Sequence, residues 1–161
     1  MSETIGVPVE PANSNREAVR GAEIVITATS ATQVVLEGSW IEPGMHINAM
    51  GANWAQKREL DAAAVDRADA VFVDSIEQAK MEAGDLIQVF GENQSRWTEV
   101  RELGGVVAGK IAGRSGASQI TLFKSNGIAT WDLAAAVRVY ELAVEQGRGQ
   151  TIPLWESTEK D

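Results

Sequence analysis

Apolar residues along the chain fall into short continuous runs, and segments with helical spacing separate them. The runs are rich in β-branched residues and occupy residues 22–30 (AEIVITATS), 40–51 (WIEPGMHINAMG), 69–75 (DAVFVDS) and 119–127 (QITLFKSNG). Continuous apolar runs of this length are typical of strands that are buried on both faces of a parallel sheet. We therefore expect four strands in the interior of the fold.

Helical patterns lie between these strands and after them. Capping residues and terminating glycines set their limits, and the segments are 15–20 (NREAVR, after Ser14), 58–68 (RELDAAAVDRA), 76–84 (IEQAKMEAG, after Ser75) and 130–147 (TWDLAAAVRVYELAVEQG). Between residues 85 and 118 the periodicity is weak, and only a short helix near 95–105 is predicted. The alternation of strands and helices predicts an α/β fold with a parallel sheet.

The two ends of the chain carry weaker patterns. Residues Ile5 to Glu10 are expected to form a short strand, which Pro8 and Pro11 confine to an edge of the sheet. Residues 148–161 are expected to be an extended tail.

Composition and charge exclude several classes of protein. The chain has 161 residues and a formal net charge of -9, with its 14 Lys and Arg scattered, which argues against binding to nucleic acid or to anionic membranes. Because there is no Cys, disulfides and thiolate catalysis are excluded, and a cytoplasmic protein is expected. The start of the chain has no signal-peptide pattern, and no apolar run approaches the roughly 20 residues that span a bilayer.

Three separated stretches, in this order, resemble one known family. They are residues 18–75, 102–114 (ELGGVVAGKIAGR) and 120–141 (ITLFKSNGIATWDLAAAVRVYE). From about Val7 to Gly147 the chain closely resembles the ornithine cyclodeaminase/mu-crystallin family, which also contains alanine dehydrogenases and related imine reductases. The resemblance implies NAD or NADP as the cofactor.

The resemblance covers only part of a family member. A full-length member has an N-terminal half that binds substrate, followed by a Rossmann domain that opens with a Gly-rich phosphate loop. This sequence contains no G-x-G-x-x-G or G-x-G-x-x-A motif. We therefore expect a truncated Rossmann-like parallel sheet with flanking helices, lacking the first β-α-β unit. Residues 1–161 are expected to be one domain, with a partial Rossmann-like unit (7–130), a C-terminal helix (131–147) and a tail (148–161).

The missing unit would leave the strand Glu23–Ala28 with an open edge, which either the segment Ile5–Glu10 or a second copy would cover. The helix 132–146 is apolar around much of its circumference and also needs a covering surface. A homodimer is therefore expected. Its interface would contain either that strand edge or one stripe of the helix, formed by Leu133, Val137, Tyr140 and Val144.

Candidate binding residues follow from the resemblance and lie near the carboxyl ends of strands, where α/β folds bind ligands. By that likeness the cofactor contacts are Thr27, Ala28, Thr29, Asn48, Gly51, Asn53, Lys57 and Ser125. Binding of NAD or NADP to this chain alone is expected to be weak or absent, because the Gly-rich loop that anchors a pyrophosphate is missing.

Asn53 stands where ornithine cyclodeaminases have the Asp of a Gly-Gly-Asp triplet, to which the acid/base role is assigned. An amide can form hydrogen bonds but cannot take up a proton near neutral pH. The family mechanism of cyclodeamination is thus disfavoured, and no catalytic residue is identified in this chain. Reduction of an imine or a keto acid is not excluded by this position.

Structural roles remain open for the other candidates. Lys57 is more typical of a solvated surface lysine than of a cofactor contact. Ser125 is equally typical of a serine that caps a turn, and Thr27 to Thr29 of a strand end that satisfies its own backbone. His46 is the only histidine, and no spaced carboxylates accompany it, so no metal site is predicted.

Two functions fit these observations. The first is a non-catalytic, oligomeric module that binds a small molecule or another protein. The second is a fragment of an NAD(P)-dependent oxidoreductase or cyclodeaminase that is active only with a separate N-terminal substrate domain.

Overall fold

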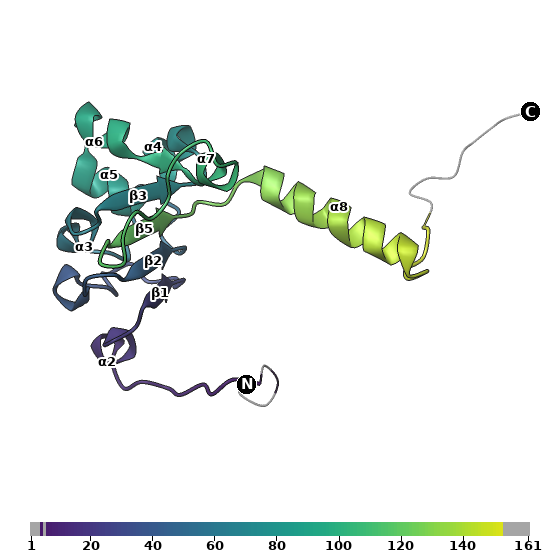
Figure 1. Ribbon diagram of the computed structural model, residues 1–161, viewed down its shortest axis with the longest axis horizontal. Coiled ribbons are helices and arrows are strands. Elements are labelled where there is room, and N and C mark those ends of the chain that lie inside the picture. Colours follow the sequence, from purple (N-terminus) through teal and green to yellow (C-terminus); the bar gives the residue numbers. More distant parts are fainter. Residues whose placement is uncertain (1–3, 5, 153–161) are drawn as a thin grey trace, which may run out of the picture. The chain divides into compact units, whose positions relative to one another are not determined.

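The computed structural model describes residue 4 and residues 6–152. The chain forms two compact units, Met1–Asn126 and Gly127–Asp161. The first unit holds a five-stranded sheet with the order β1-β2-β5-β3-β4, and every pair of neighbours is parallel (Figure 1). The strands are β1 (Ile24–Thr27), β2 (His46–Ala49), β3 (Ala70–Val73), β4 (Arg101–Glu102) and β5 (Thr121–Lys124). The predicted α/β fold with a parallel sheet is confirmed.

Short helices connect the strands, and the side chain of the residue just before the helix accepts a main-chain N–H group in four of them. Ser14, Asp61, Ser75 and Asn93 act as such N-caps. The helices of the first unit are α2 (Asn15–Val19), the 3-10 turn η1 (Gly38–Trp40), α3 (Ala62–Asp66), α4 (Ile76–Glu82), α5 (Gly84–Phe90), α6 (Gln94–Glu99) and α7 (Leu103–Val107).

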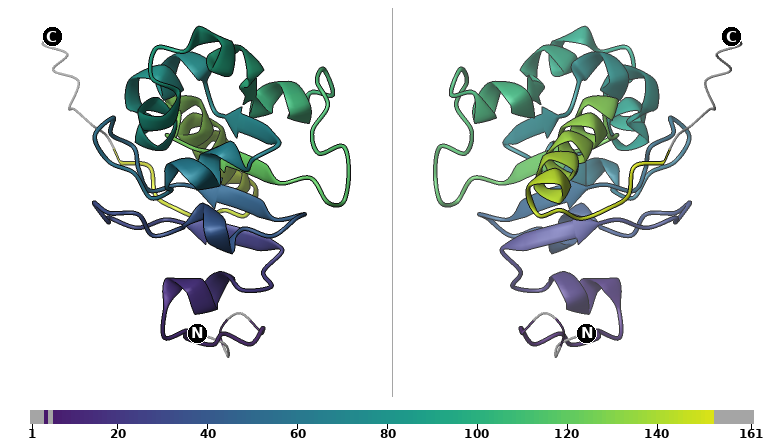
Figure 2. Two further views of the ribbon diagram at one scale, coloured as in Figure 1. Left: turned by 90° about the vertical axis from the view of Figure 1, so that its left-hand side faces the viewer. Right: turned by 90° about the vertical axis from the view of Figure 1, so that its right-hand side faces the viewer.

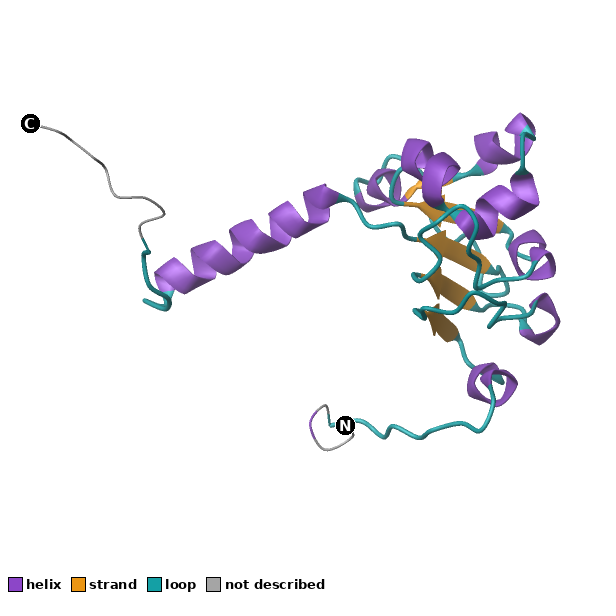
Figure 3. Ribbon diagram, turned by 180° about the vertical axis from the view of Figure 1, so that it is seen from behind, coloured by secondary structure: helices purple, strands orange, loops and turns teal. Residues whose placement is uncertain are grey.

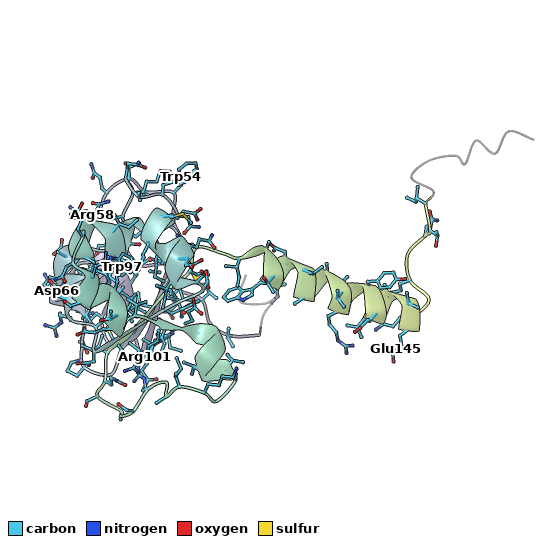
Figure 4. The ribbon with its side chains drawn as sticks, turned by 90° about the horizontal axis from the view of Figure 1, so that it is seen from above. Trp54, Arg58, Asp66, Trp97, Arg101 and Glu145 are labelled. Carbon is cyan, nitrogen blue, oxygen red and sulfur yellow. The ribbon has the colours of Figure 1, made fainter. Side chains whose placement is uncertain are left out.

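Helices α3 to α6 gather on one side of the sheet, as the view from behind shows (Figure 3). The main core lies between this layer and the sheet, and its largest fully buried apolar side chains are Leu36, Met45, Ile47, Leu60, Leu86 and Leu122. Trp97 is also buried there, packed edge-on against Phe90, whereas Trp54 is exposed at the periphery (Figure 4). Burial of each large apolar side chain stabilises the fold by roughly 1.5–3 kcal/mol. This core is therefore the main source of stability in the first unit.

The opposite face of the sheet is covered only in part. A smaller cluster forms where Leu103 and Val106 of α7 pack against Phe72 and Phe123. Toward β1 the face is bare: Ile24 and Ile26 are 63% and 65% exposed, while Val25 between them is buried. The prediction that the first strand is buried on both faces is therefore wrong for β1 within the first unit, because no described element of that unit packs over it. It holds for β5, in which all four residues are buried.

The strand predicted for Ile5–Glu10 is also absent. Residue 5 lies outside the described residues, and residues 6–10 contain no strand, with Val7 and Val9 exposed. Within the described part of the chain β1 pairs only with β2, so its other edge is open (Figure 2 shows the sheet from two sides).

Two helix boundaries differ from the prediction for identifiable reasons. The helix expected over 58–68 begins only after Asp61, because the main chain at Glu59 and Leu60 is extended and bonds to residues 35 and 36. Gly84 starts helix α5 instead of ending α4. A side chain at Gly84 would overlap the carbonyl groups of Lys57 and Trp54, so the glycine permits close packing there.

The region 85–118 contains more structure than its weak periodicity indicates. Helix α6 corresponds to the predicted short helix, whereas α5, β4 and α7 were not predicted as separate elements. Each of them has seven residues or fewer, too short to show a helical or alternating period.

The second unit consists of helix α8 (Ala129–Glu145) and the residues around it. It confirms the predicted C-terminal helix, and Gly147, with φ of 62°, follows its end. None of its residues is buried, and its exposed large apolar side chains are Trp131, Leu133, Val137, Val139, Tyr140 and Val144. Among the described helices, none has the length and apolar character that crossing a bilayer needs.

Candidate functional site

Buried carboxylates hold the loops that follow the strands. The first is Glu59, which is fully buried and accepts hydrogen bonds from the main-chain N–H and the hydroxyl of Thr29 at 2.6 and 2.7 Å. Its second oxygen accepts the N–H of Gly51 at 3.0 Å. Burial alone would raise the pKa of Glu59, but these donors outweigh it and hold the pKa below the ordinary value of 4.5. Glu59 thus joins the loop after β1 to the loop after β2 as an ionised carboxylate.

Asp85, in the first turn of α5, fixes the segment that carries Glu59. One of its oxygens accepts the main-chain N–H groups of Glu59 and Leu60 at 2.7 and 2.9 Å. Its other oxygen lies 3.7 Å from Nζ of Lys124 in an ion pair whose two side chains are fully buried. The extended conformation before α3 is therefore set by a side chain from another helix.

Lys124, the last residue of β5, binds three oxygens at the carboxyl edge of the sheet. Its Nζ donates to the main-chain oxygens of Ala49 at 3.3 Å and Ser125 at 3.1 Å, and to Oδ1 of Asn53 at 3.1 Å. An ammonium group has three N–H donors, so the three hydrogen bonds use all of them. Lys124 thereby fixes the end of β2, the end of β5 and the side chain at position 53.

Burial acts in opposite directions on the two members of the Asp85–Lys124 pair. It raises the pKa of Asp85, against the opposing effects of the Leu60 N–H and of Lys124. It lowers the pKa of Lys124, against the attraction of Asp85, Glu59 and Asp74. Both shifts reflect the cost of placing charges out of water, which close pairing offsets only in part.

A further carboxylate holds the turn after β5. Asp74, which follows β3, accepts the hydroxyl of Ser125 at 2.9 Å and the main-chain N–H of Asn126 at 2.7 Å. The ends of β3 and β5 are therefore joined in the same way as the ends of β1 and β2.

The structure brings most of the predicted binding residues together at this carboxyl edge. Those that hydrogen-bond to the charged side chains of this edge are Thr29, Gly51, Asn53 and Ser125, and Thr27 is buried at the end of β1. Ala28 is exposed between the two threonines. Lys57 is half-buried in the loop before Glu59, where its main-chain oxygen accepts a long hydrogen bond of 3.4 Å from Gln88.

Asn48 lies apart from this group. Its side chain is on the partly bare face of β2, where Oδ1 is 3.2 Å from Nε2 of His46. The other ring nitrogen of His46 is 2.8 Å from the hydroxyl of Thr121. Both residues line a cavity of about 340 Å³, together with Phe72, Leu103, Val106, Gly113, Arg114, Thr121 and Phe123. His46 thus has a structural hydrogen-bonding role, and no three His, Asp or Glu side chains of the described residues cluster closely enough to hold a metal ion.

Four charged residues that organise the edge were not among the predicted site residues: Glu59, Asp74, Asp85 and Lys124. One of them carried a sequence signal. Lys124 follows the continuous apolar run ITLF, where a charge at the end of a buried strand needs a partner. The partners of Lys124 lie 71 and 75 residues away in the chain, at Asn53 and Ala49. No local pattern links such distant positions.

Comparison with known proteins agrees with this geometry. The profile of the ornithine cyclodeaminase/mu-crystallin family matches residues 1–147. The chain belongs to this family. The resemblance inferred from the sequence is confirmed, and the sheet corresponds to the Rossmann-like NAD-binding half of family members.

Relatives and solved structures match nearly all of the chain. Delta(1)-pyrroline-2-carboxylate reductase of Bacillus cereus is 37% identical over 153 residues, which are 94% of this chain and 47% of the relative. The Thermococcus litoralis enzyme of the same name, solved with NADH and L-proline, superposes with a TM-score of 0.85 at 38% identity, over 94% of this chain and 47% of its own. An archaeal alanine dehydrogenase dimer with bound NAD gives a TM-score of 0.80 at 34% identity, over 96% and 47%.

The chain therefore spans about half the length of the relatives it matches. Both of these solved relatives contain a nicotinamide dinucleotide, and the alanine dehydrogenase is a dimer.

Proposed function

We propose that this chain contributes one dinucleotide-contacting half to an NAD(P)-dependent imine reductase, and that by itself it is an oligomeric binding module without turnover. A cytoplasmic location fits the absence of cysteine. The substrate-binding residues and the Gly-rich loop would come from a part that precedes the matched region in the relatives.

The observation that carries this proposal is the set of buried charges at the carboxyl edge. Buried ion pairs are often less stabilising than apolar side chains of the same volume, because desolvation costs several kcal/mol per ion. Here Glu59, Asp85 and Lys124 are all fully buried, and they fix the loops after β1, β2 and β5. Such costly groups at the edge where α/β folds bind ligands support a preorganised binding surface.

The cofactor contacts proposed for this surface are those of the sequence prediction. Thr27 ends β1, Ala28 and Thr29 follow it, Gly51 and Asn53 follow β2, and Ser125 follows β5. Asn48 and Lys57 remain candidates from the resemblance alone. NADH in the Thermococcus litoralis relative supports the choice of a nicotinamide dinucleotide.

Asn53 favours reduction over cyclodeamination. The cyclodeaminase reaction of the family uses an Asp at this position, and an amide cannot replace it as a base. A bound imine that enters protonated on its nitrogen needs only a hydride from the cofactor to become the amine, so reduction sets no requirement for a carboxylate here. Cyclodeamination is therefore the second candidate, and it would require another base.

A homodimer is proposed for the chain on its own. Helix α8 exposes apolar side chains, and β1 has an open edge. Contact with a second copy would cover both features. The archaeal alanine dehydrogenase, a dimer, is a precedent within the related structures.

Reconstitution tests the proposed function. The chain is mixed with the N-terminal part of the Bacillus cereus reductase that precedes the matched region, and oxidation of NADH and NADPH is followed with Δ1-pyrroline-2-carboxylate. We expect turnover from the mixture and none from either part, and ammonia should not be released from ornithine. Turnover by the chain alone, ornithine-dependent ammonia release, or an inactive mixture whose parts co-purify would contradict the proposal.

Dinucleotide affinity of the chain alone gives an independent check. Without the Gly-rich loop and its helix dipole, a pyrophosphate has no main anchor. We expect a Kd above about 1 mM, which corresponds to only about 4 kcal/mol of binding. Calorimetry that gave a micromolar Kd for NADH or NADPH would show that the chain forms a complete site.

A further inference from the structure

The side chain of Asn53 is held by a group that can only donate. Lys124 Nζ lies 3.1 Å from Asn53 Oδ1, and its two other hydrogen bonds go to main-chain oxygens. Burial acts against the ammonium form of Lys124, but the fully buried Asp85 and Glu59 and the half-buried Asp74 favour it, and the ammonium form has no acceptor. The Asn53 amide must therefore turn its oxygen toward Lys124 and its NH₂ group away from it.

The NH₂ group of Asn53 is the part of this side chain that remains available to a ligand. Its Nδ2 makes no hydrogen bond within the described part of the chain, and the residue is half-buried in the loop after β2. Position 53 thus presents two N–H donors, whereas a carboxylate at the same place would present acceptors.

The charges around Lys124 determine which kind of ligand acceptor, charged or neutral, can bind the N–H groups of Asn53. One lysine is surrounded by the carboxylates of Asp85, Glu59 and Asp74, so the negative charges outnumber the positive one. A ligand carboxylate would be repelled by this surplus, while a neutral carbonyl oxygen would not.

Building on the proposed function, we propose that Lys124 is a positioning residue that orients Asn53, and that Asn53 donates a hydrogen bond to a neutral carbonyl oxygen of the bound ligand. The carboxamide of a nicotinamide ring carries an oxygen of this kind. Position 53 would then select for a ligand acceptor; an ammonium group, although the surplus negative charge attracts it, is itself a donor and finds no acceptor on the Asn53 NH₂ group.

Three pyridine compounds that differ in one group test the selectivity. Nicotinamide carries a neutral carboxamide, nicotinate a carboxylate, and 3-(aminomethyl)pyridine an ammonium group. Each is titrated to tens of millimolar into the ¹⁵N-labelled full chain, and the Asn53 Nδ2 resonances are followed by NMR after assignment with Asn53→Ser. We expect the largest downfield shift with nicotinamide, a smaller one with nicotinate and none with 3-(aminomethyl)pyridine.

Two substitutions test the roles of the two residues. Asn53→Asp, in a half-exposed loop, should lower the affinity for nicotinamide about fivefold, the value of one ordinary hydrogen bond, and should raise that for 3-(aminomethyl)pyridine. Asn93→Asp, a capping residue of α6, is the matched control and should change neither. Lys124→Met should move the Asn53 Nδ2 resonances in the free protein and reduce their response to nicotinamide, whereas Lys110→Met on the exposed loop after α7 should not.

If Lys124→Met does not fold, the Asn53→Asp comparison still decides. An Asn53 signal that is silent to all three probes, or that responds as strongly to nicotinate or to 3-(aminomethyl)pyridine, would overturn the inference. The experiments distinguish failure of this inference from failure of the proposed function. If the reconstituted mixture is an active reductase but the Asn53 resonances do not shift, only the role of Asn53 is refuted. An inactive mixture with a selective Asn53 signal refutes only the reductase.

Discussion

At the scale of single residues, Glu59 should contribute stability that depends on its charge. In Glu59→Gln the amide oxygen can still accept from Thr29, but its NH₂ group meets the N–H donor of Gly51. We expect a loss of about 2–3 kcal/mol in the free energy of unfolding at neutral pH, the range for hydrogen bonds to a charged group.

The pH dependence follows from the sign of the shift. The pKa of Glu59 is lower in the folded protein than its ordinary value of 4.5. Its stabilisation is therefore complete above that value and is lost as the pH falls through the lower, folded pKa. Urea unfolding should show the full difference between wild type and variant near pH 7 and a smaller one near pH 3. The exposed control Glu10→Gln should have no effect, and a difference that did not change with pH would contradict an ionised Glu59.

Lys124 and Asp85 should be strongly coupled. Lys124→Met leaves the buried Asp85 without its counter-ion and should cost about 3–5 kcal/mol. Asp85→Asn keeps an oxygen for the N–H groups of Glu59 and Leu60. In Lys124→Met/Asp85→Asn neither member of the pair is left charged without the other, so the double variant should lose at least about 1 kcal/mol less than the sum of the single losses. A double-mutant cycle by urea unfolding measures this, and additive losses would mean that the two charges do not interact.

The sequence could predict where a residue lies in its own strand or loop, but not which distant residue its side chain contacts. The sequence correctly located Thr27 at the end of β1 and Gly51, Asn53 and Ser125 just after their strands, and these positions lie at one edge because the strands are parallel. The side chains that fix them were missed: Glu59 lies 30 residues from Thr29, and Lys124 lies 71 residues from Asn53. Such pairings arise only when the sheet brings its strands together.

At the scale of elements, the close packing of α5 depends on Gly84. In Gly84→Ala the new methyl group would overlap the carbonyl groups of Lys57 and Trp54, so the loop or the helix must shift. We expect a cost of about 1–3 kcal/mol, typical of overpacking in a fixed structure.

Gly104→Ala is the matched control for that change. Gly104 lies inside α7, and a Cβ there meets nothing within 4 Å. This variant should gain about 0.5–1 kcal/mol from the better helix propensity of alanine. Thermal unfolding of both proteins checks the pair, and a Gly84→Ala variant as stable as wild type would show that the contact relaxes freely.

The elements that were predicted correctly are long enough to show a periodic pattern or have a clear capping residue. Helix α8 spans 17 residues and α4 follows the N-cap Ser75, so each gave a strong local signal. The start of α3 was missed because Asp85, from another helix, holds the preceding main chain extended. The prediction that both faces of β1 are buried was wrong because an apolar sequence shows only that burial would be favourable. It does not show that another element packs over the strand.

At the scale of the whole molecule, the proposed homodimer should depend on one stripe of α8. Leu133, Val137, Tyr140 and Val144 recur at spacings of four and three residues and are all exposed. Leaving such side chains in water costs roughly 1.5–3 kcal/mol each relative to burial, a large fraction of a typical domain's stability. A two-fold partner would bury the same stripe on both copies at once.

Sedimentation of the wild type at tens of micromolar should therefore give twice the monomer mass of 17.2 kDa. Val137→Glu places a charge in the centre of the stripe and should give the monomer. Ala135→Glu adds the same charge two residues away, about 200° around the helix, and should leave the dimer intact. If the dimer survives Val137→Glu but is lost in Ile26→Lys, the bare side of β1 forms the interface instead of α8. A wild type that sediments as a monomer would refute the dimer by either route.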